Sequence, residues 1–174
     1  MKKRIIDLSV PIQDGMITHK LFSSPMITKS LTHEKDQGLG VPGDSLTFQT
    51  NVIAPLDHVG THIDSQLHFN PKGAPVDEIP IGDCIGKAVC FDFTHIPDLG
   101  EIDVADLEEA ERKTGIKVDG HIVLFNTGLH KRHYHYPADR ERMSCWTNPG
   151  ITAEATQWLY DRGSKLHGVE GPST

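Results

Sequence analysis

The pattern of hydrophobic and polar positions differs between the two halves of the chain. Up to about residue 82, short apolar stretches are separated by turns, and this pattern predicts strands at Arg4–Ser9 and Ser45–Ala54. Pro11 and then Asp14-Gly15 close the first of these strands. The N-terminal part is therefore predicted to be rich in β-structure.

From Lys87 onward, apolar runs of strand length alternate with helical patterns. Strands are predicted at Lys87–Phe93, His121–Asn126 and Lys165–Val169, and helices at Asp103–Thr114 and Thr152–Asp161. Such alternation leads to crossover connections, which join parallel strands. We therefore expect an α/β fold with a partly parallel sheet, forming one domain over residues 1–174.

Capping residues mark the ends of both predicted helices. Asp103 and Thr152 stand at the beginnings, where a side-chain oxygen can accept a hydrogen bond from a free backbone N–H. Gly115 and Gly163 follow the last turns, where the left-handed conformation that ends many helices favours glycine. The limits of these two helices are thus predicted independently of the apolar spacing.

The charge balance argues against one class of partner. The 174 residues include 17 Lys and Arg against 24 Asp and Glu, which gives a formal net charge of −7. A negatively charged protein without a run of basic residues is poorly suited to hold a phosphate backbone. Nucleic acid is therefore not expected as a partner.

Cysteine usage and hydropathy bear on the cellular location. Cys84, Cys90 and Cys145 are odd in number and form no Cys-x-x-Cys pair, which is typical of reduced thiols in a cytoplasmic protein. Asp7 and Pro11 interrupt the basic N-terminus before any apolar region of a signal peptide. No later stretch approaches the roughly 18 apolar residues of a membrane span. We expect a cytoplasmic protein without a membrane segment.

Histidine is the unusual feature of the composition, with 11 in the chain, and the densest cluster lies in one short stretch. Its sequence is His58-Val-Gly-Thr-His62-Ile-Asp64-Ser-Gln-Leu-His68-Phe69. A single histidine in a strand is more often a packed or surface residue than a metal ligand. Three histidines and one aspartate within eleven residues instead indicate a metal site.

The spacing of this motif favours an extended or bent backbone. All four positions are even, so on a strand their side chains would begin on the same face. On a helix, Asp64 would be rotated away from His58 and His62, and Gly60 makes a helix unfavourable. We therefore expect a strand or tight bend over His58–Asp64, with His68 on the turn that follows.

Two imidazoles and one carboxylate would form an open site for Zn²⁺ or Mn²⁺, with positions left for water and substrate. Zinc is the preferred expectation and manganese the alternative. His68 could then act as general base and later as acid. Gly60 would let the backbone approach the metal, and Thr61 could orient a ligand.

Two rival interpretations remain. His62-x-Asp64 with a distant histidine would satisfy the facial triad of a non-haem iron oxygenase, although His58 and His68 would then be unexplained. The second rival is a metal-binding or small-molecule-binding protein that no longer catalyses a reaction. Iron with oxygen uptake would favour the first rival, and stoichiometric metal without turnover the second.

The motif His-x-Gly-Thr-His-x-Asp followed by His-Phe resembles the signature of the cyclase family, which includes bacterial kynurenine formamidases and isatin hydrolases. The resemblance extends over most of the chain. Supporting matches lie at Asp7–Ile12, Asp14–Met16, Gly120–Gly128, Asn148–Ala155 and Gly168–Ser173.

The resemblance implies a role for each motif residue. His58, His62 and Asp64 would bind a divalent metal, and His68 would transfer protons. The implied reaction opens an amide, lactam or similar carbonyl bond of a small molecule with metal-activated water. The implied fold is a swivelling β/β/α arrangement assembled as a homo-oligomer, either a dimer or a tetramer.

Departures from the family pattern affect the details. Gln66 replaces a usual Pro, which alters the bend that carries His68, and Glu170 replaces a usual Asp. The family's aromatic residue is missing around Ile17–Lys20, which argues against an aromatic substrate such as formylkynurenine. Family members continue to a segment whose His and Glu hold a second metal in the two-metal members. The chain, ending at Thr174, is expected to lack that segment, and the second metal stays open.

A second histidine cluster follows the predicted strand at residues 121–126. His130, His133 and His135 have no carboxylate near them before Asp139. A solvated loop accounts for this composition. The functional alternative is a substrate-facing loop, because open α/β sheets bind ligands beyond the carboxyl ends of their strands.

Overall fold

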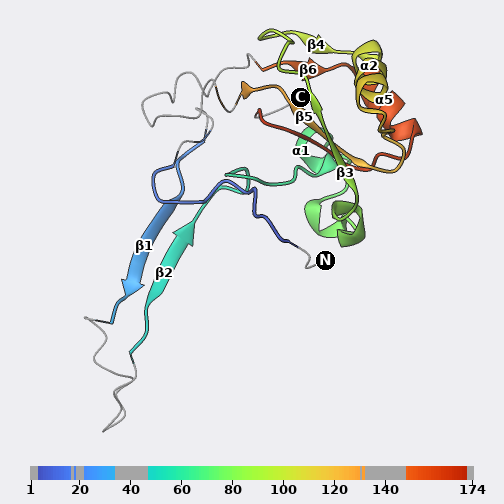
Figure 1. Ribbon diagram of the computed structural model, residues 1–174. Helices are drawn as coiled ribbons and strands as arrows, with labels where there is room; N and C mark the ends of the chain where they lie inside the picture. Colours follow the sequence, from blue (N-terminus) through green and yellow to red (C-terminus); the bar gives the residue numbers. More distant parts are fainter. Residues whose placement is uncertain are drawn as a thin grey trace. The chain divides into compact units, whose positions relative to one another are not determined.

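The computed structural model describes residues 4–16, 18, 22–33, 47–129, 131 and 148–171. The chain divides into two compact units, Met1–Asp64 and Ser65–Thr174, and each is described by itself (Figure 1). The second histidine cluster, His130, His133 and His135, lies outside the described residues, as does Cys145. The expectation of one domain over residues 1–174 stays a prediction.

An antiparallel pair of strands forms the regular part of the first unit. Strand β1 (Met26–Leu31) pairs with β2 (Thr50–Ala54), with Met26 opposite Ala54 and an irregularity between Lys29 and Leu31. The predicted strand at 45–54 is thus confirmed over its last five residues. Strand β1 was not predicted, because both strands are largely exposed and no buried face imposes an alternation of apolar and polar residues.

The predicted strand at Arg4–Ser9 is wrong, since this segment forms no strand. An oxygen of the Asp7 carboxylate accepts a hydrogen bond of 2.9 Å from the backbone N–H of Ser9, a local contact typical of turns. The backbone N–H of Val10 donates a hydrogen bond of 2.9 Å to the Thr61 hydroxyl. Side chains therefore take the hydrogen bonds that a neighbouring strand would have made.

The second unit begins with three short helical segments. They are α1 (Gln66–Phe69) and two 3₁₀ turns, η1 (Val76–Glu78) and η2 (Ile81–Cys84). The chain after α1 folds back so closely that a Cβ at Gly73 would lie 2.6 Å from the backbone of Gln66. His68, predicted on a turn, lies on this single helical turn.

A parallel three-stranded sheet is the centre of the second unit (Figure 1). Its strands are β3 (Ala88–Asp92), β5 (Ile122–Asn126) and β7 (His167–Val169), in the order β3-β5-β7. The predicted strands and their parallel pairing are confirmed. A further parallel pair, β4 (Glu101–Ile102) with β6 (Gly150–Ile151), was missed because two residues carry no detectable period.

Both predicted helices are confirmed together with their caps. Helix α2 (Val104–Thr114) begins with a reciprocal pair, in which the side chains of Asp103 and Asp106 each accept from the other's backbone N–H. It ends at Gly115, whose φ of 70° is left-handed. Helix α5 (Ala153–Asp161) is capped by the Thr152 hydroxyl, which accepts from Ala155 N–H at 3.1 Å.

The main core lies between the sheet and these two helices, which run side by side in Figure 1. Alternate residues of β3 and β5 point into it, as expected for strands with one buried face. Its buried members are Val89, Phe91, Phe93, Ile102, Leu107, Ala110, Val118, Val123, Phe125, Ala155 and Leu159. The core therefore holds the sheet and the two helices of the second unit together. Within the part of the chain that the structure describes, no helix is long and apolar enough to span a membrane.

One strand residue makes the stability of the fold depend on pH. His167 of β7 is half-buried with its ring 5.9 Å from that of Phe125, and burial lowers the pKa of His167. Between this lowered value and the ordinary value of about 6.5, the unfolded chain binds more protons than the folded one. The free energy of unfolding is therefore expected to fall as the pH drops through this window, starting near the ordinary value.

Urea denaturation of the wild type and of His167→Gln across pH 8 to about 5 checks this prediction, because the ordinary histidine pKa lies inside that range. Other histidines titrate in the same range, so the difference between the two proteins is the relevant quantity. The difference in the free energy of unfolding is expected to be constant at alkaline pH. Below the ordinary histidine pKa, the wild type is expected to lose stability relative to the variant. Parallel curves for the two proteins would contradict the prediction.

Candidate metal centre

The histidine motif lies on a tightly bent loop, so the bend and not the strand is the correct expectation. Gly60 has a left-handed φ of 64°, and a Cβ there would lie 3.2 Å from Ile12 Cγ1 and 3.4 Å from the carbonyl oxygen of Val10. The Thr61 hydroxyl accepts the Val10 N–H at 2.9 Å. Gly60 and Thr61 therefore hold the loop against the N-terminal segment.

Three side chains of this loop converge on one point. The Nε2 atoms of His58 and His62 each lie 3.1 Å from the same oxygen, Oδ1 of Asp64. The two imidazole rings stand nearly edge to face, with centroids 5.1 Å apart. The loop thus brings together two ring nitrogens and a carboxylate oxygen, the donor types that Zn²⁺ and Mn²⁺ bind.

The hydrogen bond that each ring makes on the side away from Asp64 determines which of its nitrogens can bind a metal. His62 Nδ1 lies 3.0 Å from the backbone carbonyl of Gly60, which only accepts, so Nδ1 must carry the proton. His58 Nδ1 lies 2.8 Å from Oδ1 of Asp57, and the hydrogen bond from His58 is the main cause of the lowered pKa of Asp57. In the neutral form of either ring, Nε2 therefore presents its lone pair to Asp64.

The lone pairs of two ring nitrogens and of a carboxylate oxygen repel one another unless a proton or a metal ion lies among them. Metal–ligand bonds of about 2.1 Å separate neighbouring ligand atoms by about 3.0 to 3.4 Å, and the observed 3.1 Å falls in this range. The side chains of His58, His62 and Asp64 are 21%, 32% and 31% exposed. The distance of each histidine from Asp64 thus fits ligation of a divalent ion, and the exposure leaves such an ion accessible to water and a ligand.

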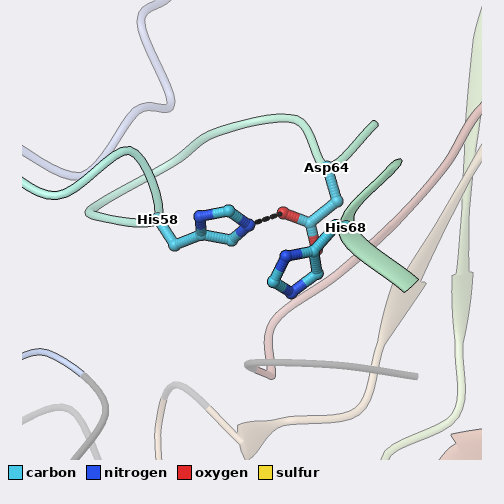
Figure 2. A group of neighbouring side chains, drawn as sticks. All are labelled: His58, Asp64 and His68. Carbon is cyan, nitrogen blue, oxygen red and sulfur yellow. Dashed lines mark ion pairs between the residues drawn. The ribbon is translucent and has the colours of Figure 1, made fainter. Parts of the chain in front are cut away.

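His68 also lies within reach of this arrangement. Within the described residues, the group whose ligand atoms all lie within 4.8 Å of one another consists of His58, Asp64 and His68 (Figure 2). This group contains His68 and does not include His62, which was predicted as a ligand. The ring of His68 packs edge to face on Phe69, at 4.3 Å between centroids. Phe69 itself is 72% exposed, so it does not bury the ring of His68.

Asp57 contacts the candidate site but was not predicted from the sequence. It lies directly before the motif and bonds the first histidine on the side facing away from Asp64. A carboxylate next to a histidine ligand was the available signal, because metal-binding histidines usually donate their other N–H to such a group. Adjacency alone gave no indication that the two side chains would meet.

Glu170 connects the ends of two strands of the second unit. Its Oε2 accepts hydrogen bonds from Thr127 N–H at 2.8 Å, the Thr127 hydroxyl at 3.0 Å and Leu129 N–H at 3.2 Å. Glu170 follows β7, and Thr127 follows β5. The glutamate thus fixes the Asn-Thr-Gly turn at the carboxyl edge of the sheet.

The parallel sheet and the convergent His-His-Asp loop define an α/β protein with a candidate metal centre. Comparison with known families gives the class: the family model Cyclase, described as "Putative cyclase", matches residues 6–174. The chain therefore belongs to the cyclase family, as its motif indicated.

Several relatives and solved structures resemble the chain. A "Kynurenine formamidase" of Erythrobacter litoralis is 31% identical over 142 residues, which are 82% of this chain and 55% of that relative. The chain thus spans about half the length of this relative. A "novel cyclase" crystal structure has a TM-score of 0.72 at 20% identity, covering 97% of this chain and 66% of the other. Isatin hydrolase A of Labrenzia aggregata has a TM-score of 0.66 at 22% identity, covering 97% and 68%. These structural matches show that the fold is shared.

Proposed function

We propose that this chain carries the metal centre of a hydrolase that opens an amide, lactam or related carbonyl bond of a small molecule. The observation that carries the proposal is the approach of two histidine Nε2 atoms to one oxygen of Asp64 at 3.1 Å. The kynurenine formamidase and isatin hydrolase names of the relatives support the reaction class. Assembly as a dimer or tetramer and a cytoplasmic location stay predictions.

Each side chain of the motif has a defined task in this proposal. His58, His62 and Asp64 hold the ion, with Zn²⁺ the first choice and Mn²⁺ the second. A divalent ion in such a site activates water and polarises a carbonyl group. His68 takes up a proton as general base and returns it to the leaving group as general acid, a role supported by its position within 4.8 Å of the ligand atoms of His58 and Asp64.

Hydrolysis assays on metal-free protein reloaded with Zn²⁺ or Mn²⁺ test this function. Formylated anilines, isatin and simple lactones are suitable substrates, because each contains a carbonyl bond of the proposed class. Turnover that requires the metal is expected, together with a loss of about 100-fold or more in kcat for His68→Ala at unchanged metal content. His95→Ala, which removes an exposed histidine elsewhere, is the control and is expected to retain full activity.

The alternatives give different results in the same experiments. Bound iron with oxygen uptake and no hydrolysis would indicate an oxygenase. Stoichiometric zinc without turnover of any of these substrates, unaffected by His68→Ala, would indicate a binding protein. Either result would overturn the hydrolase proposal.

A further inference from the structure

Asp57 lies at the outer end of a chain of polar contacts that leads to the candidate metal centre. Its Oδ1 is 2.8 Å from Nδ1 of His58, and Nε2 of the same ring is 3.1 Å from Oδ1 of Asp64. The imidazole of His58 is thus held between two carboxylates. The carboxylate at Nδ1 accepts a hydrogen bond from the ring, and the carboxylate at Nε2 belongs to the proposed ligand set.

A neutral histidine exists in two tautomers, and only one of them suits this site. With the proton on Nε2, the atom facing Asp64 would be a donor and unable to bind an ion. The carboxylate of Asp57 favours the proton on Nδ1, because it accepts a strong, charge-assisted hydrogen bond there. Its negative charge also increases the electron density of the ring, and therefore the strength of Nε2 as a ligand.

His62 provides an internal comparison. Its Nδ1 bonds the backbone carbonyl of Gly60 at 3.0 Å, an uncharged acceptor that no side-chain substitution removes. His58 instead depends on a side chain, and that side chain is 87% exposed. The two histidines therefore differ in the acceptor that holds the proton on Nδ1. Only the acceptor of His58 can be removed by changing one side chain.

We propose that Asp57 is a positioning residue of the metal centre. It fixes the ring and the tautomer of His58 without touching the ion. The inference rests on the metal centre of the proposed function, but not on the hydrolysis itself. Outer carboxylates of this kind contribute about 10-fold to 100-fold in metal affinity, and the exposure of Asp57 places the expected effect at about 10-fold.

Zinc affinity and the tautomer of His58 are the two measurements that test this role. Zn²⁺ binding is measured by competition with a chromophoric chelator for the wild type, Asp57→Ala and Asp57→Asn. The alanine variant is expected to bind about 10-fold more weakly. The zinc affinity of the asparagine variant is expected to lie between those of the wild type and the alanine variant. Its amide oxygen still accepts the hydrogen bond from His58 Nδ1 but carries no charge. In metal-free protein, ¹⁵N NMR of the histidine rings is expected to show His58 protonated on Nδ1 in the wild type and shifted toward Nε2 in Asp57→Ala.

Asp7→Ala is the matched control. Asp7 is another exposed carboxylate of the first unit that accepts a local hydrogen bond, from Ser9, so its removal changes the charge by the same amount. Zinc binding by this variant is expected to equal that of the wild type within about twofold. A purely structural role of Asp57 would change the melting temperature but not the tautomer of His58.

Unchanged zinc affinity and an unchanged His58 tautomer in Asp57→Ala would overturn the proposal. A wild type that binds no zinc would overturn the metal centre and this role together. Zinc binding without hydrolysis would count against the proposed function alone, because the effect of Asp57 on affinity is measured in the absence of any substrate.

Discussion

Asp64→Asn is expected to lose tight metal binding and with it all metal-dependent activity. Oδ1 of Asp64 is the atom that both histidine Nε2 atoms approach at 3.1 Å, so the carboxylate is the centre of the proposed ligand set. The substitution keeps the shape of the side chain but removes its negative charge and leaves two neutral imidazoles. Outer residues already contribute up to about 100-fold in affinity, so a direct ligand is expected to contribute at least that much. Metal content after dialysis and chelator competition measure the loss.

The melting temperature of the metal-free protein distinguishes the loss of the metal site from the loss of the fold. The metal-free forms of Asp64→Asn and the wild type are expected to melt at similar temperatures, because Asp64 is 31% exposed and the main core of the second unit does not include it. Asp77→Asn removes the same charge from an exposed 3₁₀ turn and is expected to bind metal normally. Wild-type metal content in purified Asp64→Asn would show that this carboxylate is not a ligand.

The candidate ligands could be predicted because they lie so close together in the sequence. The ten peptide bonds from His58 to His68 limit how far apart these side chains can lie, so residue type and spacing suffice to predict the donor set. The supports of the loop are different. The partner of Thr61 is the backbone of Val10, 51 residues away, and no local pattern predicts such a contact.

The fold shows the same division between local and distant determinants. Helix α2 could be predicted almost to the residue, since a capping pair and a terminal glycine define its ends. Strand β1 could not, because neither of its faces is buried and its partner β2 lies beyond a long connection. The apolar run at Arg4–Ser9 predicted a strand, but the carboxylate of Asp7 accepts a local hydrogen bond from the backbone N–H of Ser9 instead.

The most destabilising single polar substitution is expected at Glu111 of α2. Its side chain is 2% exposed; Oε2 bonds Nζ of Lys117 at 2.7 Å, and Oε1 accepts the N–H of Val118 at 2.8 Å. Arg162, just after α5, lies 3.3 Å from Oε1 and stacks 4.0 Å above the ring of Trp158. Glu111 therefore connects the helix, the loop that follows it and the end of the second helix.

Glu111→Ala is expected to lower the free energy of unfolding by about 3 kcal/mol. The loss arises mainly at Val118, which is completely buried, so that its N–H would have no replacement partner. The two cations contribute less, because the side chains of Lys117 and Arg162 are 67% and 31% exposed and can turn toward water. Urea denaturation measures the change.

Glu109, two residues earlier on the same helix, offers the matched comparison. It also pairs with two cations, Arg112 and Lys113, but it is 41% exposed, so water and salt screen its charge. Glu109→Ala is therefore expected to change stability far less than Glu111→Ala, although both variants lose one glutamate with two cationic partners. Equal losses in the two variants would show that ion pairing, and not the satisfaction of a buried N–H, determines the contribution of Glu111. Glu111→Gln separates the two effects further, since its amide oxygen can still accept from Val118 while the charge is gone.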